Sequence, residues 1–148
     1  MFSRMLKLPA EVRAKADLSS LEIAVHAAAP CPPQVKEAMI DWWGPIIHEY
    51  YGATEGLGFT SCNSEEWLAH KGTVGKVMLG AMYILDEDGN KSPPGVPGEL
   101  WFKTATEFSY FNNEEKTKAS QSSDGSMSTV GDVGYVDDGF LYLTDRST

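Results

Sequence analysis

A helix-forming segment between two short β-forming runs most limits how this chain can fold. From Val35 to Trp42, apolar residues recur at the spacing i, i+3, i+4, i+7 with polar residues between them, after prolines at 32 and 33. Residues 21–26 and 46–50, on either side, have the composition of strands. Because a crossover helix joins strands that run parallel, residues 21–50 predict a β-α-β unit with a parallel strand pair.

The rest of the chain is predicted to be mostly β. Glycine and proline become frequent after Gly52, and the helical spacing does not return for long. The predicted elements are strands at 77–85, 98–103, 133–136 and 140–143 and a short helix at 113–117. The last two strands flank a short turn and predict a hairpin. We expect an α/β fold followed by a mostly β part, a small distorted antiparallel β-barrel.

The expected division of the chain follows from this change in pattern. Residues 1–66 should form the end of an α/β subdomain, and residues 67–148 the small β-barrel subdomain. Trp42 and Trp43 are expected to pack the helix rather than to bind a ligand, since large aromatic residues at helical spacing usually serve the core. His26 and His48 are expected to make structural hydrogen bonds.

Charge and composition exclude several classes of partner. The chain has 21 acidic and 12 basic residues, a net charge of −9, which would repel nucleic acid and anionic membrane surfaces. No apolar run approaches the roughly 18 to 20 residues of a membrane span, and the first residues do not form a signal peptide. Cys31 and Cys62 lack metal-ligand spacing, so free thiols are expected. We therefore expect a cytoplasmic protein.

The first segment that suggests chemistry, residues 48–56, follows the second predicted strand. Ligands of open α/β sheets collect at this position. Gly52 allows close backbone approach, Thr54 offers a hydroxyl to a phosphate oxygen, and Glu55 is a hard oxygen ligand of the kind that Mg²⁺ accepts. The alternative is a simple turn and helix cap, and spacing alone favours it.

The second segment extends from Asp132 through the predicted hairpin to Arg146. A carboxylate can accept hydrogen bonds from both ribose hydroxyls, and an arginine can pair with ribose or phosphate oxygens. The two strands of the hairpin run out and back, so they bring Asp132 and Arg146 to the same end. The alternative is a surface aspartate in a turn and a surface arginine in a weak ion pair, and for this segment alone that alternative is favoured.

Together these segments resemble the adenylate-forming superfamily of acyl-CoA synthetases, luciferases and peptide-synthetase adenylation domains. The matching motifs occur in the family's order over nearly the whole chain: HAAAP at 26–30, YGATE at 51–55, GELW at 98–101, YFN at 110–112 with Thr117, GDVGY at 131–135 and GFLYLTDR at 139–146. Within the superfamily the chain looks most like fatty or aromatic acid CoA ligases.

The resemblance implies a role for each matching residue. Nucleotide contacts would come from Glu49, Tyr50, Tyr51, Gly52, Thr54, Asp132 and Arg146. Tyr51 would pack on adenine, Thr54 would contact the α-phosphate, and Asp132 would hold the ribose hydroxyls. Glu55 would bind Mg²⁺ and, with Thr54, serve catalysis. Ala28, Ala29 and Pro30 would line the pocket for the acyl group.

The implied reaction joins a small-molecule carboxylic acid to coenzyme A. The carboxylate attacks the α-phosphate of ATP to give acyl-AMP and pyrophosphate, and the thiol of coenzyme A then displaces AMP. The implied cofactors and co-substrates are therefore ATP or AMP, Mg²⁺ and coenzyme A. Positioning and charge neutralisation would supply most of the catalysis.

Two parts that the family uses have no match in this sequence. One is a Ser/Thr/Gly-rich phosphate loop with lysine, expected upstream, and the other is a C-terminal domain with a catalytic lysine, expected after Arg146. We therefore expect an internal fragment that is inactive alone and can self-associate through exposed apolar surface. The alternative is a stand-alone, non-catalytic scaffold or nucleotide-binding module that kept the fold.

Three positions depart from the family's pattern. Val130 stands where threonine usually precedes Gly-Asp, with Thr129 one place earlier. Met127 replaces a usual tryptophan, and Ser109 replaces a usual glycine. We expect the first departure to remove or shift a hydroxyl group at the site, and the other two to affect mainly the loops.

Overall fold

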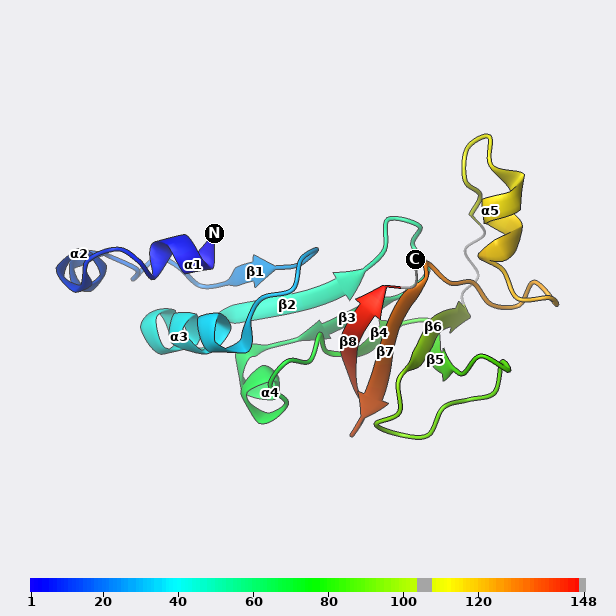
Figure 1. The fold of residues 1–148 in the computed structure, drawn as a ribbon. Coiled ribbons are helices and arrows are strands. Elements are labelled where there is room, and N and C mark those ends of the chain that lie inside the picture. Colours follow the sequence, from blue (N-terminus) through cyan, green and yellow to red (C-terminus); the bar gives the residue numbers. More distant parts are fainter. Residues whose placement is uncertain (104–107, 147–148) are drawn as a thin grey trace.

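The computed structural model describes residues 1–103 and 108–146. In chain order the elements are α1 (Phe2–Met5), α2 (Ala10–Lys15), β1 (Ala24–His26), α3 (Pro33–Trp43), β2 (Ile47–Gly52), β3 (Phe59–Cys62), α4 (Ser64–Ala69), β4 (Lys76–Leu79), β5 (Ala81–Leu85), β6 (Gly98–Lys103), α5 (Glu114–Ala119), β7 (Asp132–Asp137) and β8 (Phe140–Arg146). They form two four-stranded sheets, with orders β1-β2-β3-β4 and β5-β6-β7-β8. In Figure 1, α1 to α3 lie at one end of the molecule and α5 at the other.

The predicted β-α-β unit is confirmed. Strands β1 and β2 are parallel, with Ala24 opposite Ile47, and α3 is the crossover helix between them. Proline suits the first turn of α3, where the missing N–H has no helical partner, and Gly44 ends the helix at a φ of 84°. Strand β1 is shorter than the predicted run.

The buried face of α3 is rotated from the expected one. The residues of α3 that are buried are Lys36, Met39 and Ile40, whereas the apolar spacing predicted a face centred on Val35, Ala38, Met39 and Trp42. A lysine interrupts the apolar pattern on the true face, so the sequence pattern favoured the neighbouring one. Trp42 and Trp43 are partly buried and pack against the first core, as expected.

Strand β3 and helix α4 were not predicted. Strand β3 pairs antiparallel with β2 and has only four residues, too few for a clear alternation. Helix α4 carries a signal that could have revealed it, because Asn63 and Glu66 form a capping box at its start. The side chain of Asn63 accepts a hydrogen bond from Glu66 N, and Glu66 Oε2 accepts one from Asn63 N.

The single strand predicted for residues 77–85 is wrong. Gly80 has a φ of 78° and divides this segment into β4 and β5. Strand β4 completes the first sheet, while β5 begins the second. A left-handed residue turns the chain out of the extended path, and glycine adopts that conformation without the cost of a Cβ. The segment therefore links the two sheets.

The second sheet is antiparallel throughout, and its predicted hairpin is confirmed. Strands β7 and β8 pair from Asp137 opposite Phe140 to Asp132 opposite Arg146. Over the described residues β5 and β8 form the two edges of an open sheet, so the predicted small distorted β-barrel is not confirmed. A backbone bridge between Gly75 and Leu141 connects this sheet to the chain just before β4. The division of the chain at residue 66 stays a prediction.

The two sheets have separate cores, and the loop after β2 joins them. The first core contains Met39, Ile40, Ile47, Cys62 and Trp67, and the second contains Leu57, Ile84, Leu100, Phe102 and Leu141. Leu57 follows β2 of the first sheet yet is fully buried in the second core. Beside it, a Cβ on Gly58 would lie 2.2 Å from the Phe102 ring. The loop at 53–58 is therefore held between the two sheets by the packing of its last two residues against the second core.

The helices are short. The longest, α3, has 11 residues, and α5 begins as predicted after Asn113, whose side chain accepts a hydrogen bond from Lys116 N. Among the helices of the described residues, none combines the length and apolar character that crossing a membrane requires.

Candidate nucleotide site

A cleft of about 660 Å³ lies where the two sheets meet, and it brings most of the predicted site residues together. The predicted residues that line it are Ala28, Ala29, Pro30, Glu49, Tyr50, Tyr51, Gly52, Thr54, Glu55 and Asp132. The loop before α3, strand β2 with the loop that follows it, and the start of β7 supply them. The two motifs, separate in sequence, therefore face one common space.

Arg146 is placed by its backbone. It is the last residue of β8 and lies directly opposite Asp132 at the start of β7. The prediction that the hairpin returns the chain to the end where it began is therefore confirmed for the main chain.

Asp132 is joined to β2 across the cleft. The Tyr51 hydroxyl donates a hydrogen bond of 2.5 Å to Asp132 Oδ2. The Tyr51 ring also stacks on Phe102 of the second core, with centroids 6.5 Å apart. Packing and a charge-assisted hydrogen bond thus fix Tyr51 between a strand of each sheet.

Glu55 is also held from two directions. Its Oε2 accepts a hydrogen bond of 3.2 Å from the Thr54 hydroxyl, and its Oε1 accepts one of 3.0 Å from the Tyr110 hydroxyl. Tyr110 lies 55 residues further along the chain, just before α5. The carboxylate is therefore oriented by its own loop and by a distant segment.

The departure at Val130 moves a hydroxyl group out of the cleft. Val130 lines the cleft, while the neighbouring Thr129 is buried. The Thr129 hydroxyl donates a hydrogen bond of 3.3 Å to Glu99 Oε1 and accepts one of 3.0 Å from Gly131 N. The threonine thus shapes the turn before Asp132, where Gly131 has a φ of 80°.

Sequence reasoning missed several residues that line the cleft. They are Cys31, Ala53, Trp67, Gly72, Thr73, Val74, Leu143 and Thr144. Thr73 is buried and donates a hydrogen bond to Leu141 O at 2.7 Å, and Thr60 donates one to Val74 O at 2.7 Å. These contacts join the segment after α4 to both sheets. No sequence motif marks it, because its place depends on packing.

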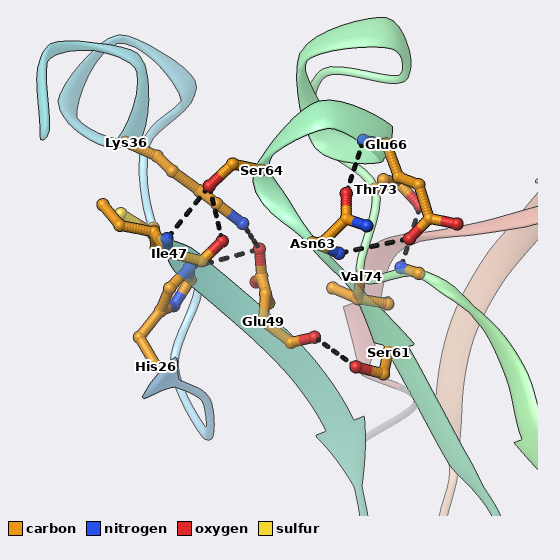
Figure 2. Close-up of polar contacts among 12 residues, drawn as sticks. His26, Lys36, Ile47, Glu49, Ser61, Asn63, Ser64, Glu66, Thr73 and Val74 are labelled. Atoms are coloured by element: carbon orange, nitrogen blue, oxygen red, sulfur yellow. Dashed lines mark hydrogen bonds and ion pairs between the residues drawn. The ribbon is translucent and has the colours of Figure 1, made fainter. Parts of the chain in front are cut away.

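A buried charged cluster beneath the cleft was also missed. Lys36 Nζ lies 2.5 Å from Glu49 Oε2, and the lysine side chain is fully buried. His26 Nε2 lies 3.3 Å from the same oxygen, although without the alignment of a hydrogen bond. Figure 2 shows Lys36 reaching from α3 and His26 from β1 toward Glu49 on β2. The predicted structural hydrogen bond of His26 is therefore not confirmed for Nε2, which makes a close contact with the Glu49 carboxylate instead.

Glu49 is stabilised as a carboxylate. Burial acts to raise its pKa, but contacts with His26 and Lys36 and the charge of Lys36 outweigh it, so the pKa of Glu49 is lowered. The Lys36 ammonium also lies 4.8 Å from the Trp67 ring centroid. Nearby, Ser64 of α4 bonds to both backbone groups of Ile47 (Figure 2). Glu49 and its surroundings thus fix three elements under the cleft.

The cysteines are free thiols, as the spacing predicted. Burial raises the pKa of both, that of Cys62 to about 11, so the Cys62 thiol is protonated at neutral pH. In the described part of the chain, no group of three or more His, Cys, Asp or Glu residues is arranged to hold a metal ion. Glu55, as a single carboxylate, still fits a Mg²⁺ ion whose other ligands are phosphate and water.

Comparison with known proteins decides the family. The model of the AMP-binding enzyme family matches residues 1–110. The chain belongs to the AMP-binding enzymes. Its relatives are CoA ligases, a group of ligases within the adenylate-forming acyl-CoA synthetase superfamily, so the resemblance seen in the sequence is confirmed.

The relatives are longer than this member of the family. The probable CoA ligase CCL5 of Humulus lupulus is 35% identical over 96% of this chain, which spans 27% of its length. The peroxisomal OPC-8:0-CoA ligase 1 of Arabidopsis thaliana is 33% identical over 92% of this chain, which spans 26% of its length. The chain therefore corresponds to about a quarter of these AMP-binding enzymes.

Solved structures have the same fold over this region. Amide bond synthetase McbA from Marinactinospora thermotolerans is 29% identical, with a TM-score of 0.82 over 98% of this chain and 30% of its own. The Bacillus subtilis o-succinylbenzoate CoA synthetase MenE, in complex with ATP and a magnesium ion, is 27% identical, with a TM-score of 0.70 over 87% of this chain and 29% of its own.

The buried pair makes a stability prediction. Lys36→Met leaves Glu49 buried without its main partner and should lower the free energy of unfolding by about 3–5 kcal/mol. The double variant K36M/E49L, which removes both charges, should recover most of that loss. Urea denaturation of the three proteins measures both effects.

Lys71→Met is the matched control. Lys71 pairs with Glu37 at 2.6 Å, but both side chains are nearly half exposed. Its removal should cost no more than about 1 kcal/mol. Equal losses in the free energy of unfolding for K36M and K71M would contradict the prediction that burial makes the Lys36–Glu49 pair more important than an exposed pair.

Proposed function

We propose that this chain forms the adenine, ribose, magnesium and acyl side of the active site of an ATP-dependent acyl-CoA synthetase. The observation that carries the proposal is that Thr54, Glu55 and Asp132 line one cleft. Its CoA ligase relatives and the ATP and magnesium complex of a structural neighbour support it.

The nucleoside would lie along the end of β2. The Tyr51 ring offers an apolar face for adenine, and the backbone from Glu49 to Gly52 would frame the base. Asp132 would accept hydrogen bonds from the ribose hydroxyls; a carboxylate has about four lone-pair sites, enough to accept these in addition to the bond from Tyr51. Arg146, opposite Asp132, would contact ribose or phosphate.

The phosphates would lie over the loop at 53–58. Thr54 would donate its hydroxyl to the α-phosphate, and Glu55 would ligate Mg²⁺. The ion, when bound, neutralises phosphate charge and so assists attack on the α-phosphorus. The clamped loop would hold both side chains in place during this step, so less ordering is needed when the nucleotide binds.

The acyl group would lie beside Ala28, Ala29 and Pro30. These side chains are small and line the same cleft, so they leave room next to the proposed α-phosphate position. A carboxylate oxygen there would attack the α-phosphorus and release pyrophosphate, forming acyl-AMP. The thiol of coenzyme A would then attack the acyl carbon and release AMP. Ala28 adopts a φ of 70°, which turns the chain at this edge of the cleft.

Nucleotide binding tests the site directly. In a ¹⁵N NMR titration with AMP, we expect the amide signals of Gly52, Thr54 and Asp132 to shift together. Asp132→Asn should weaken AMP binding by about tenfold or more, because a charged acceptor of ribose hydroxyls is lost. Asp88→Asn, in an exposed turn, is the control and should bind AMP like the wild type. Unchanged affinity in D132N would contradict the ribose assignment.

The chain alone is predicted not to complete the reaction. Transition-state stabilisation is lost when part of a composite site is missing, and this chain spans 27% of a CoA ligase. We expect no ATP-dependent release of pyrophosphate and no thioester from the purified chain with fatty or aromatic acids and coenzyme A. Turnover above a no-enzyme control would contradict this prediction.

AMP binding without turnover is also what a nucleotide-binding scaffold would show. Adding the remaining segments of a CoA ligase in trans distinguishes a ligase segment from a scaffold, because restored turnover favours the ligase.

Self-association is proposed from the first sheet. Apolar side chains are exposed at both edge strands: Ile23 and Val25 at or beside β1, and Met78 and Leu79 on β4. Such surface favours contact between copies. Val25→Lys with Leu79→Lys should reduce the sedimentation coefficient at high protein concentration. Phe111→Lys, at an equally exposed apolar residue beside α5, should not. A strictly monomeric wild type would contradict the proposal. The net charge of −9 argues against nucleic acid as a partner. A cytoplasmic location is proposed from the two free thiols, which suit a reducing compartment.

A further inference from the structure

The segment from Phe108 through α5 contains a motif to which the nucleotide site assigns no role, yet it reaches into that site. Tyr110 donates its hydroxyl to Glu55 Oε1 at 3.0 Å. We propose that Tyr110 is a positioning residue that holds the Glu55 carboxylate in the orientation that a nucleotide-bound divalent cation requires. This inference rests on the proposed function, because it takes Glu55 as the metal ligand.

Hydrogen bonds within the motif fix the backbone of Tyr110. Its N–H donates to Thr117 Oγ1 at 2.9 Å, and its carbonyl accepts a hydrogen bond from Asn113 N at 3.2 Å. The Thr117 hydroxyl donates in turn to Asn113 O at 2.9 Å. Asn113 also caps α5 through Lys116 N. Tyr110 is thus attached to the first turn of a capped helix.

The Tyr110 ring is fixed as well. The Lys116 ammonium lies 4.0 Å from its centroid, and Phe108 packs edge-on with centroids 5.4 Å apart. Both contacts restrict rotation of the ring and therefore the position of its hydroxyl. The residue spacing from Tyr110 to Lys116 and Thr117 is what builds this arrangement.

The direction of the hydrogen bond agrees with a positioning role. An ionised carboxylate only accepts hydrogen bonds, so the phenol is the donor. The Glu55 side chain is only partly buried, and ordering a glutamate side chain costs up to roughly 1.5–2 kcal/mol. Partners of this kind, which orient a metal ligand without touching the metal, typically change metal affinity by about 10- to 100-fold when removed.

Binding of Mn²⁺ in the presence of ATP, followed by electron paramagnetic resonance, tests the inference on the 148-residue chain. Tyr110→Phe keeps the ring and its contacts with Lys116 and Phe108 but removes the hydroxyl. We expect it to weaken Mn²⁺ binding about tenfold. Glu55→Gln should weaken binding at least as much. The double variant should be no worse than E55Q, because Tyr110 acts only through Glu55.

Tyr83→Phe is the matched control. Tyr83 also lies beneath a lysine, with the Lys91 ammonium 4.5 Å from its ring centroid, but it does not line the cleft. Removal of the Tyr83 hydroxyl should leave Mn²⁺ affinity unchanged. Thermal unfolding of Y110F should match that of Y83F, which separates positioning from loss of stability.

The possible outcomes separate this inference from the proposed function. Wild-type affinity in Y110F together with weakened binding in E55Q would overturn the role of Tyr110 and leave the proposed function intact. Additive losses in the double variant would also overturn it, since Tyr110 would then act independently of Glu55. Unchanged binding in E55Q, or no Mn²⁺ binding by the wild type, would overturn the metal assignment and with it this inference.

Discussion

The buried carboxylate of Glu49 is the constraint on which the arrangement of the first sheet depends. A charge removed from water is tolerated only when opposite charge and hydrogen bonds surround it. Lys36 provides that charge from α3, and the His26 ring from β1 lies against the same oxygen of Glu49. Three elements of the β-α-β unit must therefore keep one relative position, and this fixes where β2 leaves the first core.

The position of β2 in turn determines the cleft. At its end, Tyr51 crosses to Asp132 of the second sheet, and the following loop buries Leu57 in the second core. Tyr110, just before α5, donates a hydrogen bond to Glu55. Two phenols thus reach two carboxylates across the boundary between the sheets. Both pairs join segments distant in sequence, so the cleft forms only when the sheets are packed together.

The departures from the family pattern have local consequences. Val130 gives the cleft an apolar lining side chain, while the hydroxyl of Thr129 is used inside the second sheet near Glu99. This arrangement still supports the turn at Gly131 that precedes Asp132. The valine beside Asp132 therefore changes the chemistry of the cleft wall more than the path of the chain.

The sequence by itself determined the β-α-β unit, the hairpin of β7 and β8 and the two motif segments that face the cleft, because these follow from local periodicity, turn residues and short motifs. It did not determine the break at Gly80, the open second sheet or the burial of Lys36. Each of these depends on which surfaces meet after the chain folds. Periodicity ranks a lysine as a solvent-facing residue, and only the tertiary structure places Glu49 where it offsets the cost of burying that lysine.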